Sequence, residues 1–182
     1  MPDSFDIFIG SVAPGGYAWI IPKGDNIANV GIGVHHKHID GSLKDRLDEF
    51  CQSLGYEVLS WGGGWIPLGG MVKTAVHDNV LAVGDAAGLV MPSNGGGIGQ
   101  AIFSGKLAAD TVVAHLKEGT PLAAYDTTIK QSMGKQLAIS TRTKNLFWTF
   151  CRNDWMTNAA MRFLGVNGLR RAVDCRRPFL IL

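Results

Sequence analysis

The chain has 182 residues, of which 46% are hydrophobic and 18% charged, a balance typical of a globular protein with one sizeable core. Its net charge is only +2, and no basic stripe with interleaved aromatic residues occurs, which argues against a nucleic-acid partner. The three cysteines, Cys51, Cys151 and Cys175, form no CxxC pair, so they indicate neither a zinc site nor a disulfide framework and favour a cytoplasmic setting.

The first part of the chain is predicted to fold as an antiparallel meander followed by a helix. Residues 5–10 alternate like a half-buried strand, and residues 17–21 are rich in sheet-forming side chains. After a turn, residues 28–34 predict the third strand. Helical spacing of apolar side chains predicts a helix over residues 42–54, and residues 57–65 are expected to add a strand.

The second part is predicted to be mainly helical. Residues 71–76 and 80–83 indicate a further strand pair, and a helix is expected from residue 97 to Gly119. Residues 122–150 predict a long helix with a break near Gly134. The helix from residue 97 is expected to have an apolar face of Ile98, Ala101, Ile102, Gly105, Ala109, Val112 and Leu116. Because sheet precedes helices, the predicted fold class is α+β.

The most informative motif follows the strand Val80–Val83. The strand ends at Gly84 and presents a lone carboxylate, Asp85, before a small-residue turn and a glycine cluster that opens a helix. A carboxylate suits the hydroxyls of a sugar alcohol, and a helix N-terminus suits a phosphate. Together they predict a site for a phosphorylated, polyhydroxylated cofactor. The candidate cofactor-binding residues are Gly84, Asp85, Ala86, Pro92, Gly95, Gly96, Gly97, Ile98 and Gly99.

A second motif lies in the predicted meander. Strand alternation places Tyr17, Trp19 and Ile21 on one face, and two aromatic rings aligned in this way can wall an elongated apolar pocket. Core packing is the other explanation for such a pair. Gly31 and Gly33 in the following strand favour the pocket, because glycine inside a strand often marks the close approach of a ligand.

Three segments together resemble the geranylgeranyl reductase family, which includes archaeal lipid reductases and chlorophyll-pathway enzymes. These are YAWIIPKGDNIANVGIGV, then GGWIPLGG, then VGDAAGLVMPSNGGGIGQAIFSGKLAA, and the resemblance covers residues 5–117. It implies an FAD-dependent reductase that saturates isoprenoid double bonds with electrons from NADPH or a ferredoxin-like donor. It also implies that Asp85 holds the ribityl chain of FAD and that the following helix faces the pyrophosphate.

The resemblance further implies an isoprenoid pocket formed by Tyr17, Trp19, Pro22 and Trp65, with Ile21 where the family usually has Phe. No catalytic residue is assigned, although Tyr17 is a conceivable proton donor. The family begins with a GxGxxG Rossmann half, and no such fingerprint occurs in this chain. The chain is therefore expected to be the C-terminal part of such an enzyme, with an incomplete FAD site and little activity without its N-terminal FAD-binding half.

The same reasoning predicts three functional parts. Residues 1–79 would bind the isoprenoid, residues 80–117 would contact FAD, and residues 118–182 would form a helical C-terminal part. Two other functions stay open: a fragment of a flavin-dependent monooxygenase or halogenase, and a non-catalytic isoprenoid-binding module. Measuring oxygen dependence in a longer homologue would separate the first from a reductase.

The sequence also bears on metal binding and on membrane contact. His35, His36 and His38 lack other metal-ligating side chains at suitable spacing except Asp40, so a solvated turn is favoured and no metal site is predicted. No window of about 18 uncharged apolar residues predicts a membrane span. The C-terminal residues suit either peripheral membrane contact or, more simply, helix packing with a solvated charged face. They comprise Phe147, Trp148, Phe150, Trp155, Met156 and Phe163, with Arg152, Arg162, Arg170, Arg171, Arg176 and Arg177.

Overall fold

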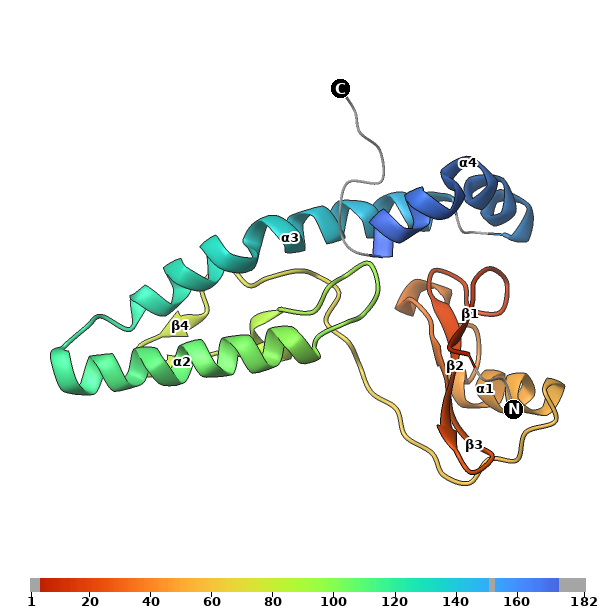
Figure 1. Cartoon of the computed structure of the whole chain (residues 1–182), viewed down its shortest axis with the longest axis horizontal. Coiled ribbons are helices and arrows are strands. Elements are labelled where there is room, and N and C mark those ends of the chain that lie inside the picture. The colour runs from red at the N-terminus through yellow and green to blue at the C-terminus, as the bar shows by residue number, and fades with distance from the viewer. Residues whose placement is uncertain (1–3, 151–152, 174–182) are drawn as a thin grey trace. The chain divides into compact units, whose positions relative to one another are not determined.

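The computed structural model describes residues 4–150 and 153–173, which form two compact units (Figure 1). The first unit contains Met1–Gly63 and Leu146–Gly165, and the second contains Gly64–Asn145 and Val166–Leu182, as far as these residues are described. The predicted α+β class is confirmed, since small antiparallel sheets and helices make up both units. The three functional parts expected from the sequence concern roles and stay a prediction.

The first unit is built on a three-stranded antiparallel sheet in the order β1-β2-β3. Its strands are β1 (Asp6–Phe8), β2 (Tyr17–Gly24) and β3 (Ile27–Gly33), so the predicted meander is confirmed. Asp25 and Asn26 join β2 to β3, and both have a positive φ. A type I′ hairpin turn needs this conformation at its two central residues, and Asp and Asn tolerate it better than most other side chains.

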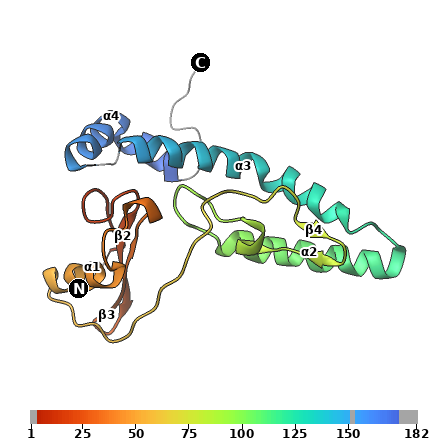
Figure 2. The same cartoon turned by 180° about the vertical axis from the view of Figure 1, so that it is seen from behind.

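This sheet has one packed face and one open face. Ala18 and Ile32 are buried on the packed face, which helix α1 (Leu43–Ser53) covers with its apolar side chains (Figures 1 and 2). Because side chains alternate along a strand, Tyr17 and Trp19 lie on the opposite face. The open face is therefore the only face of β2 on which these two rings can meet a ligand.

Residues 57–65 form no strand, so this prediction was wrong. A strand needs a neighbour for its backbone hydrogen bonds, and the surroundings of Gly62–Gly64 are open space. Part of the segment lies instead along α1, where Nζ of Lys44 is 4.2 Å from the centre of the Trp61 ring. The apolar side chains of the segment are exposed, with Leu59 at 72%, so its composition does not correspond to a buried strand.

Helix α4 (Asp154–Val173) is interrupted by the non-helical conformation of Gly165. In the first unit the carboxylate of Asp154 accepts hydrogen bonds from the backbone N–H of Ser11 at 2.7 Å and from its hydroxyl at 2.9 Å. These bonds lower the pKa of Asp154. A Cβ at Gly10 would lie 2.4 Å from Oδ1 of Asp154, so the contact depends on glycine at that position.

The second unit combines a short hairpin with two long helices. The hairpin strands are β4 (Val76–His77) and β5 (Val80–Leu81), which confirms the predicted pair in a shortened form. Helices α2 (Ile98–Glu118) and α3 (Ala123–Phe150) follow, and the hairpin lies between them in both views (Figures 1 and 2). The predicted break near Gly134 is absent because one glycine costs a helix only about 1 kcal/mol.

Helix α2 packs through its small residues, which the sequence predicts to allow close approach, and not through its predicted apolar face. Its buried residues are the small ones, Ser104, Ala108 and Thr111. The predicted apolar face is largely exposed, with Ile102 at 70% and Leu116 at 77%. Small side chains let α2 approach the core of the unit closely, so the larger apolar residues are left without cover in the described part of the chain. That core contains Ala75, Ala87, Leu89, Met91, Ala108, Tyr125, Ile129 and Leu137.

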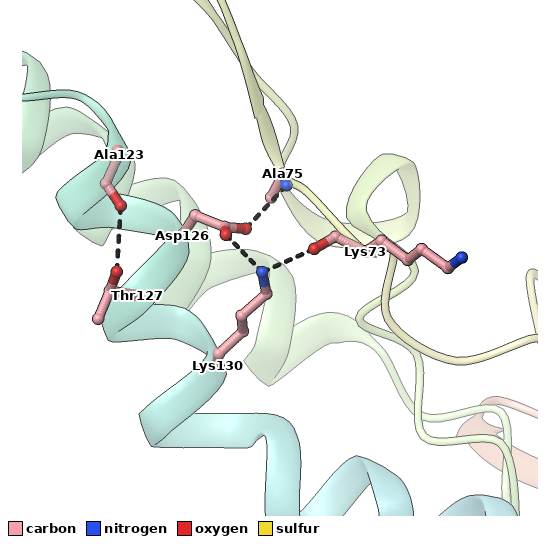
Figure 3. A network of polar contacts seen from close by, with 6 residues as sticks. All are labelled: Lys73, Ala75, Ala123, Asp126, Thr127 and Lys130. Carbon is pink, nitrogen blue, oxygen red and sulfur yellow. Dashed lines mark hydrogen bonds and ion pairs between the residues drawn. The ribbon is translucent and has the colours of Figure 1, made fainter.

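A polar network fastens α3 to the segment before the hairpin (Figure 3). The carboxylate of Asp126 accepts hydrogen bonds from the backbone N–H of Ala75 at 2.9 Å and from Nζ of Lys130 at 2.5 Å. Lys130 also donates to the carbonyl of Lys73 at 2.6 Å. Burial acts to raise the pKa of Asp126, but the bonds from Lys130 and Ala75 outweigh it, and the net pKa is lowered.

Candidate functional site

The Gly-Asp-Ala-Ala motif forms a turn of 3-10 helix, η2 (Gly84–Ala87), that is fixed to α2. The backbone N–H of Gly84 donates to Oγ of Ser104 at 3.0 Å. Gly84 has a φ of +51°, and a Cβ there would lie 3.1 Å from Cβ of Ala101. Both conditions select glycine, since a side chain would be strained by the backbone and crowded by the helix. The backbone of the turn, which carries Asp85, is therefore fixed relative to α2.

Gly88 ends the turn under still tighter constraint. Its φ is +66°, and a Cβ would lie only 2.2 Å from the carbonyl oxygen of Gly70. The backbone N–H of Val72 donates to the carbonyl of Ala87 at 3.1 Å on the same side. The segment containing Gly70 therefore packs directly against the turn, which explains why the motif continues as glycine after Ala87.

A closed loop leads from this turn to the start of α2. The backbone N–H of Met91 donates to the carbonyl of Gly96, and that of Gly95 donates back to the carbonyl of Met91, both at 2.8 Å. On α3, Oγ of Ser140 accepts a hydrogen bond from the backbone N–H of Ser93 at 2.9 Å. Ser140 is fully buried, so the loop is anchored from inside the unit.

The loop brings Asp85 to the N-terminus of α2. Oδ1 of Asp85 lies 3.4 Å from the position that a Cβ of Gly97 would occupy, and Gly97 is the N-cap residue of the helix. The cap makes no side-chain hydrogen bond, and the first N–H groups of a helix have no intrahelical acceptor. A carboxylate and a helix N-terminus thus adjoin, and the carboxylate is exposed.

The other candidate cofactor residues, near Asp85 and the N-terminus of α2, differ in how far they are exposed to solvent. Ala86, Ile98 and Gly99 are exposed, and a Cβ at Gly99 would meet nothing within 4 Å. Pro92 is buried in the loop, and the N–H of Gly96 is taken up by Oδ1 of Asn94 at 2.9 Å. The backbone N–H of Gly96 is therefore already bonded, and the free donors are expected in the first turn of α2.

The open face of the first unit carries the second candidate site. The rings of Tyr17 and Trp19 have centroids 5.6 Å apart. Nε1–H of Trp19 donates to Oδ1 of Asn29 at 2.8 Å, and a Cβ at Gly31 would lie 2.0 Å from the indole. The indole is therefore laid across the backbone of β3 and held at one edge. We call Tyr17, Trp19, Ile21, Asn29, Gly31 and Gly33 the aromatic strip.

Not all predicted pocket residues lie on this strip. Alternation puts Pro22 on the other face of β2, with Ala18 and Ile20. Trp65 belongs to the second unit, where its side chain is 82% exposed. Of the four residues, the structure brings together Tyr17 and Trp19. Burial raises the pKa of Tyr17, so the phenol keeps its proton at neutral pH.

Several positioning residues were not found from the sequence. Ser104 accepts a hydrogen bond from Gly84 of the Gly-Asp-Ala-Ala turn, and Ser140 accepts one from Ser93 of the following loop. Asn29 holds the indole of Trp19. Lys144 is also buried, and its Nζ donates to the carbonyl of Leu68 at 2.7 Å, while burial lowers its pKa. The sequence indicates such a role only for Ser104 and Ser140, because each stands among apolar residues of its helix, and a buried hydroxyl needs a hydrogen-bond partner.

Other expected features can be placed only in part. No group of three or more side chains able to hold a metal gathers within residues 4–150 and 153–173. No helix among these residues has both the length and the apolar character needed to cross a bilayer. Cys151, Arg152, Cys175, Arg176 and Arg177 lie outside the described residues, as do the side chains of Trp148, Phe150 and Arg170.

Comparisons with known proteins show that the chain is similar to geranylgeranyl reductases. Residues 1–61 match the family model described as the geranylgeranyl reductase catalytic domain. The chain is 44% identical over 117 residues to digeranylgeranylglycerophospholipid reductase 2 of Methanosphaera stadtmanae and 38% identical over 152 residues to digeranylgeranylglycerophospholipid reductase 1 of Methanothermobacter thermautotrophicus. The predicted resemblance is therefore confirmed.

A further relative extends the similarity over almost the whole chain. The digeranylgeranylglycerophospholipid reductase of Methanoculleus marisnigri is 34% identical over 98% of this chain and 49% of its own length. The Methanosphaera and Methanothermobacter proteins align with 62% and 79% of the chain but only 30% and 38% of their own lengths. The chain thus spans less than half the length of these relatives.

One solved structure shows the same fold. The crystal structure of a geranylgeranyl bacteriochlorophyll reductase-like protein from Thermoplasma acidophilum has a TM-score of 0.70. The match covers 96% of this chain and 51% of that chain at 24% sequence identity. It supports the arrangement of elements within each unit.

Proposed function

We propose that this chain is the C-terminal portion of an FAD-dependent reductase that saturates geranylgeranyl double bonds of membrane lipids or tetrapyrrole side chains, with NADPH or a ferredoxin as electron donor. The observation that carries this proposal is the aromatic strip. The indole of Trp19 lies over Gly31 and is fixed by Asn29, so the sheet presents an aromatic ring held against the backbone of β3. A linear hydrocarbon needs such a surface, because its recognition rests on contact area.

The second unit offers groups suited to the ribityl chain and the phosphate of a flavin. Asp85 is exposed beside the start of α2, where it can accept hydrogen bonds from ribityl hydroxyls, and the first amides of α2 can donate to a phosphate. Gly97 and Gly99 leave the approach free of side chains. Bound FAD would supply the hydride, while these residues hold and orient the cofactor and the phenol of Tyr17 is a candidate to hold a proton at the strip.

The exposed face of α2 supports a partner for this unit. Ile98, Ile102, Val113 and Leu116 lie along one side of the helix that starts at the flavin site. We assign this side to the FAD-binding half, since the relatives are more than twice as long as the stretch they share with this chain. A half that completes the site must adjoin the N-terminus of α2, and an apolar surface there gives it something to bury.

Peripheral contact with a membrane from the cytoplasmic side belongs to the same proposal. On α4 the aromatic side chains of Trp155 and Phe163 are 79% and 81% exposed, and the exposed Arg162 directly precedes Phe163. Aromatic and basic side chains together suit the interface of a lipid bilayer. A lipid substrate would have to be taken from that interface.

The strip is tested by comparing two prenyl alcohols of different length on Trp19→Ala. The variant should weaken binding of geranylgeraniol about tenfold and binding of geraniol much less, because only the longer chain covers the indole. Trp61→Ala is the matched control, since it removes an exposed indole elsewhere in the same unit. Calorimetric titration measures both affinities. Equal weakening of both alcohols, together with a large loss of stability, would make Trp19 a core residue and sink the substrate assignment.

The flavin site is tested with FAD in two steps. The chain alone should bind FAD weakly, because Asp85 and the α2 amides offer only a few hydrogen bonds of about 1–3 kcal/mol each. In a protein that joins this chain to a flavin-binding half, Asp85→Ala should loosen FAD about tenfold to a hundredfold. Unchanged affinity would leave Asp85 as a turn residue. Activity that requires oxygen would favour a monooxygenase instead.

A further inference from the structure

The three histidines that follow β3 form a cluster that the proposed reductase does not use. A short 3-10 helix, η1 (His36–His38), gathers the rings, with centroids of His35 and His36 4.1 Å apart and those of His35 and His38 6.0 Å apart. Lys37 lies between them in the sequence, and His36, Lys37 and His38 are exposed. Nδ1 of His35 accepts a hydrogen bond from the backbone N–H of Lys37 at 3.4 Å, and within the described residues no carboxylate forms an ion pair with His36, Lys37 or His38.

The backbone is shaped to make room for these rings. A Cβ at Gly15 would lie 2.8 Å from Cδ2 of His38 and 3.2 Å from Cβ of His35, and Gly15 has a φ of +69°. A Cβ at Gly16 would lie 1.9 Å from the carbonyl oxygen of Gly33. Two consecutive glycines thus let the turn before β2 pack against both the histidines and the end of β3.

This packing places the cluster at one end of the aromatic strip. Tyr17 pairs with Gly33 in the register, and His35 follows Gly33 by two residues in an extended conformation. At about 3.3 Å per residue, the cluster begins about 7 Å beyond the Tyr17 end of the strip. A ligand lying along the strip would therefore reach these basic groups with its head.

The chemistry of the cluster points to an anion. Imidazole N–H groups and the ammonium group of Lys37 are hydrogen-bond donors, and an anion suits a site in which several such donors lie close together. A phosphate has enough acceptor oxygens to take hydrogen bonds from two rings and an ammonium group at once. A carboxylate has fewer acceptors, and a neutral head group would leave the ammonium group of Lys37 unpaired.

We propose that His35, His36, Lys37 and His38 form a phosphate-binding site that takes the phosphate head of a prenyl lipid lying along the aromatic strip. The identity of the lipid rests on the proposed function, whereas the affinity for phosphate does not. The same side chains could take free inorganic phosphate, which shares the chemistry, so the test includes both sources.

The first arm follows the histidine ring C–H resonances of the full chain by NMR at mildly acidic pH, where imidazoles begin to carry charge. Titration with inorganic phosphate should shift the three cluster resonances with saturation. His77 and His115 serve as internal references, because they belong to the second unit. Lys37→Gln should weaken the apparent affinity roughly tenfold, whereas Lys23→Gln, an exposed lysine on β2, should leave it unchanged. Parallel drift of all five histidines, or equal effects of the two variants, would overturn the site.

The second arm compares geranylgeranyl phosphate with geranylgeraniol. The phosphate should bind about tenfold tighter to the wild-type chain, and Lys37→Gln should remove most of that difference. If inorganic phosphate shifts the cluster but the two prenyl ligands bind equally, the assignment to a lipid head is wrong. If the cluster responds to phosphate and neither prenyl ligand binds, the proposed isoprenoid function fails while the phosphate site stands.

Discussion

The indole of Trp19 lies across the backbone of Gly31 on the neighbouring strand, so closely that a Cβ on Gly31 would be 2.0 Å from Cζ2 of the ring. The two residues are direct cross-strand partners in the register of β2 and β3. Asn29 holds the indole nitrogen at 2.8 Å, which fixes the ring over the glycine and away from other rotamers. The exposed surface of the strip is thus formed by a ring face supported from below by backbone.

Gly31→Ala should displace the indole. The added methyl has no space beneath the ring, so either the ring leaves its position or the strands separate, at a cost of about 1–3 kcal/mol in the free energy of unfolding. Gly33→Ala is the matched control on the same face of β3, because its Cβ would meet its nearest atoms at 3.8 Å and 3.9 Å. Urea unfolding compares the two. Equal stability of the variants would mean that the indole rests elsewhere.

Much of this arrangement could be predicted from the sequence, and the misses have a common cause. The meander, α1 and the meeting of Asp85 with a glycine-opened helix follow from local periodicity and turn residues. The Trp19–Asn29 bond depends on strand register, and the burial of Ser104 depends on which face of α2 meets the core. Hydrophobic periodicity identifies an apolar face but not the element, or the partner, that covers it.

Gly88→Ala should be among the most damaging single changes in the second unit. The backbone at φ +66° is strained for alanine, and the methyl would overlap the carbonyl of Gly70 at 2.2 Å. We expect a loss of more than about 2 kcal/mol of unfolding free energy. Gly119 has a similar φ of +72°, but a Cβ there would meet nothing within 4 Å. Gly119→Ala therefore measures the cost of the backbone conformation alone, which should be about 1 kcal/mol of unfolding free energy. Similar losses for both would show that the contact with Gly70 is unimportant.

Substitutions on the two sides of α2 should change the stability of this chain by different amounts. Ile102→Gln and Leu116→Gln replace exposed apolar side chains with a good helix former and should change stability by less than about 0.5 kcal/mol. Ala108→Leu inserts bulk against the core and should cost about 1–3 kcal/mol. Chemical unfolding measures each change. A large loss for Leu116→Gln would show that the apolar side is already covered, which would remove the surface assigned to the FAD-binding half.

Asp126 should make the second unit sensitive to acid. Its folded pKa lies below the unfolded value of about 3.9, so its stabilisation is present above that value and is lost as pH falls through the folded pKa. Asp126→Asn keeps an acceptor for Ala75 but removes the charge that faces Lys130. Stability of the variant, measured by urea unfolding from neutral pH downward, should therefore fall less steeply in the acid range than that of the wild-type chain. Asp110→Asn, which removes an exposed carboxylate paired with Lys106, should leave the slope close to wild type. If the curves for wild type and Asp126→Asn stay parallel below about pH 5, the network of Figure 3 does not govern acid stability.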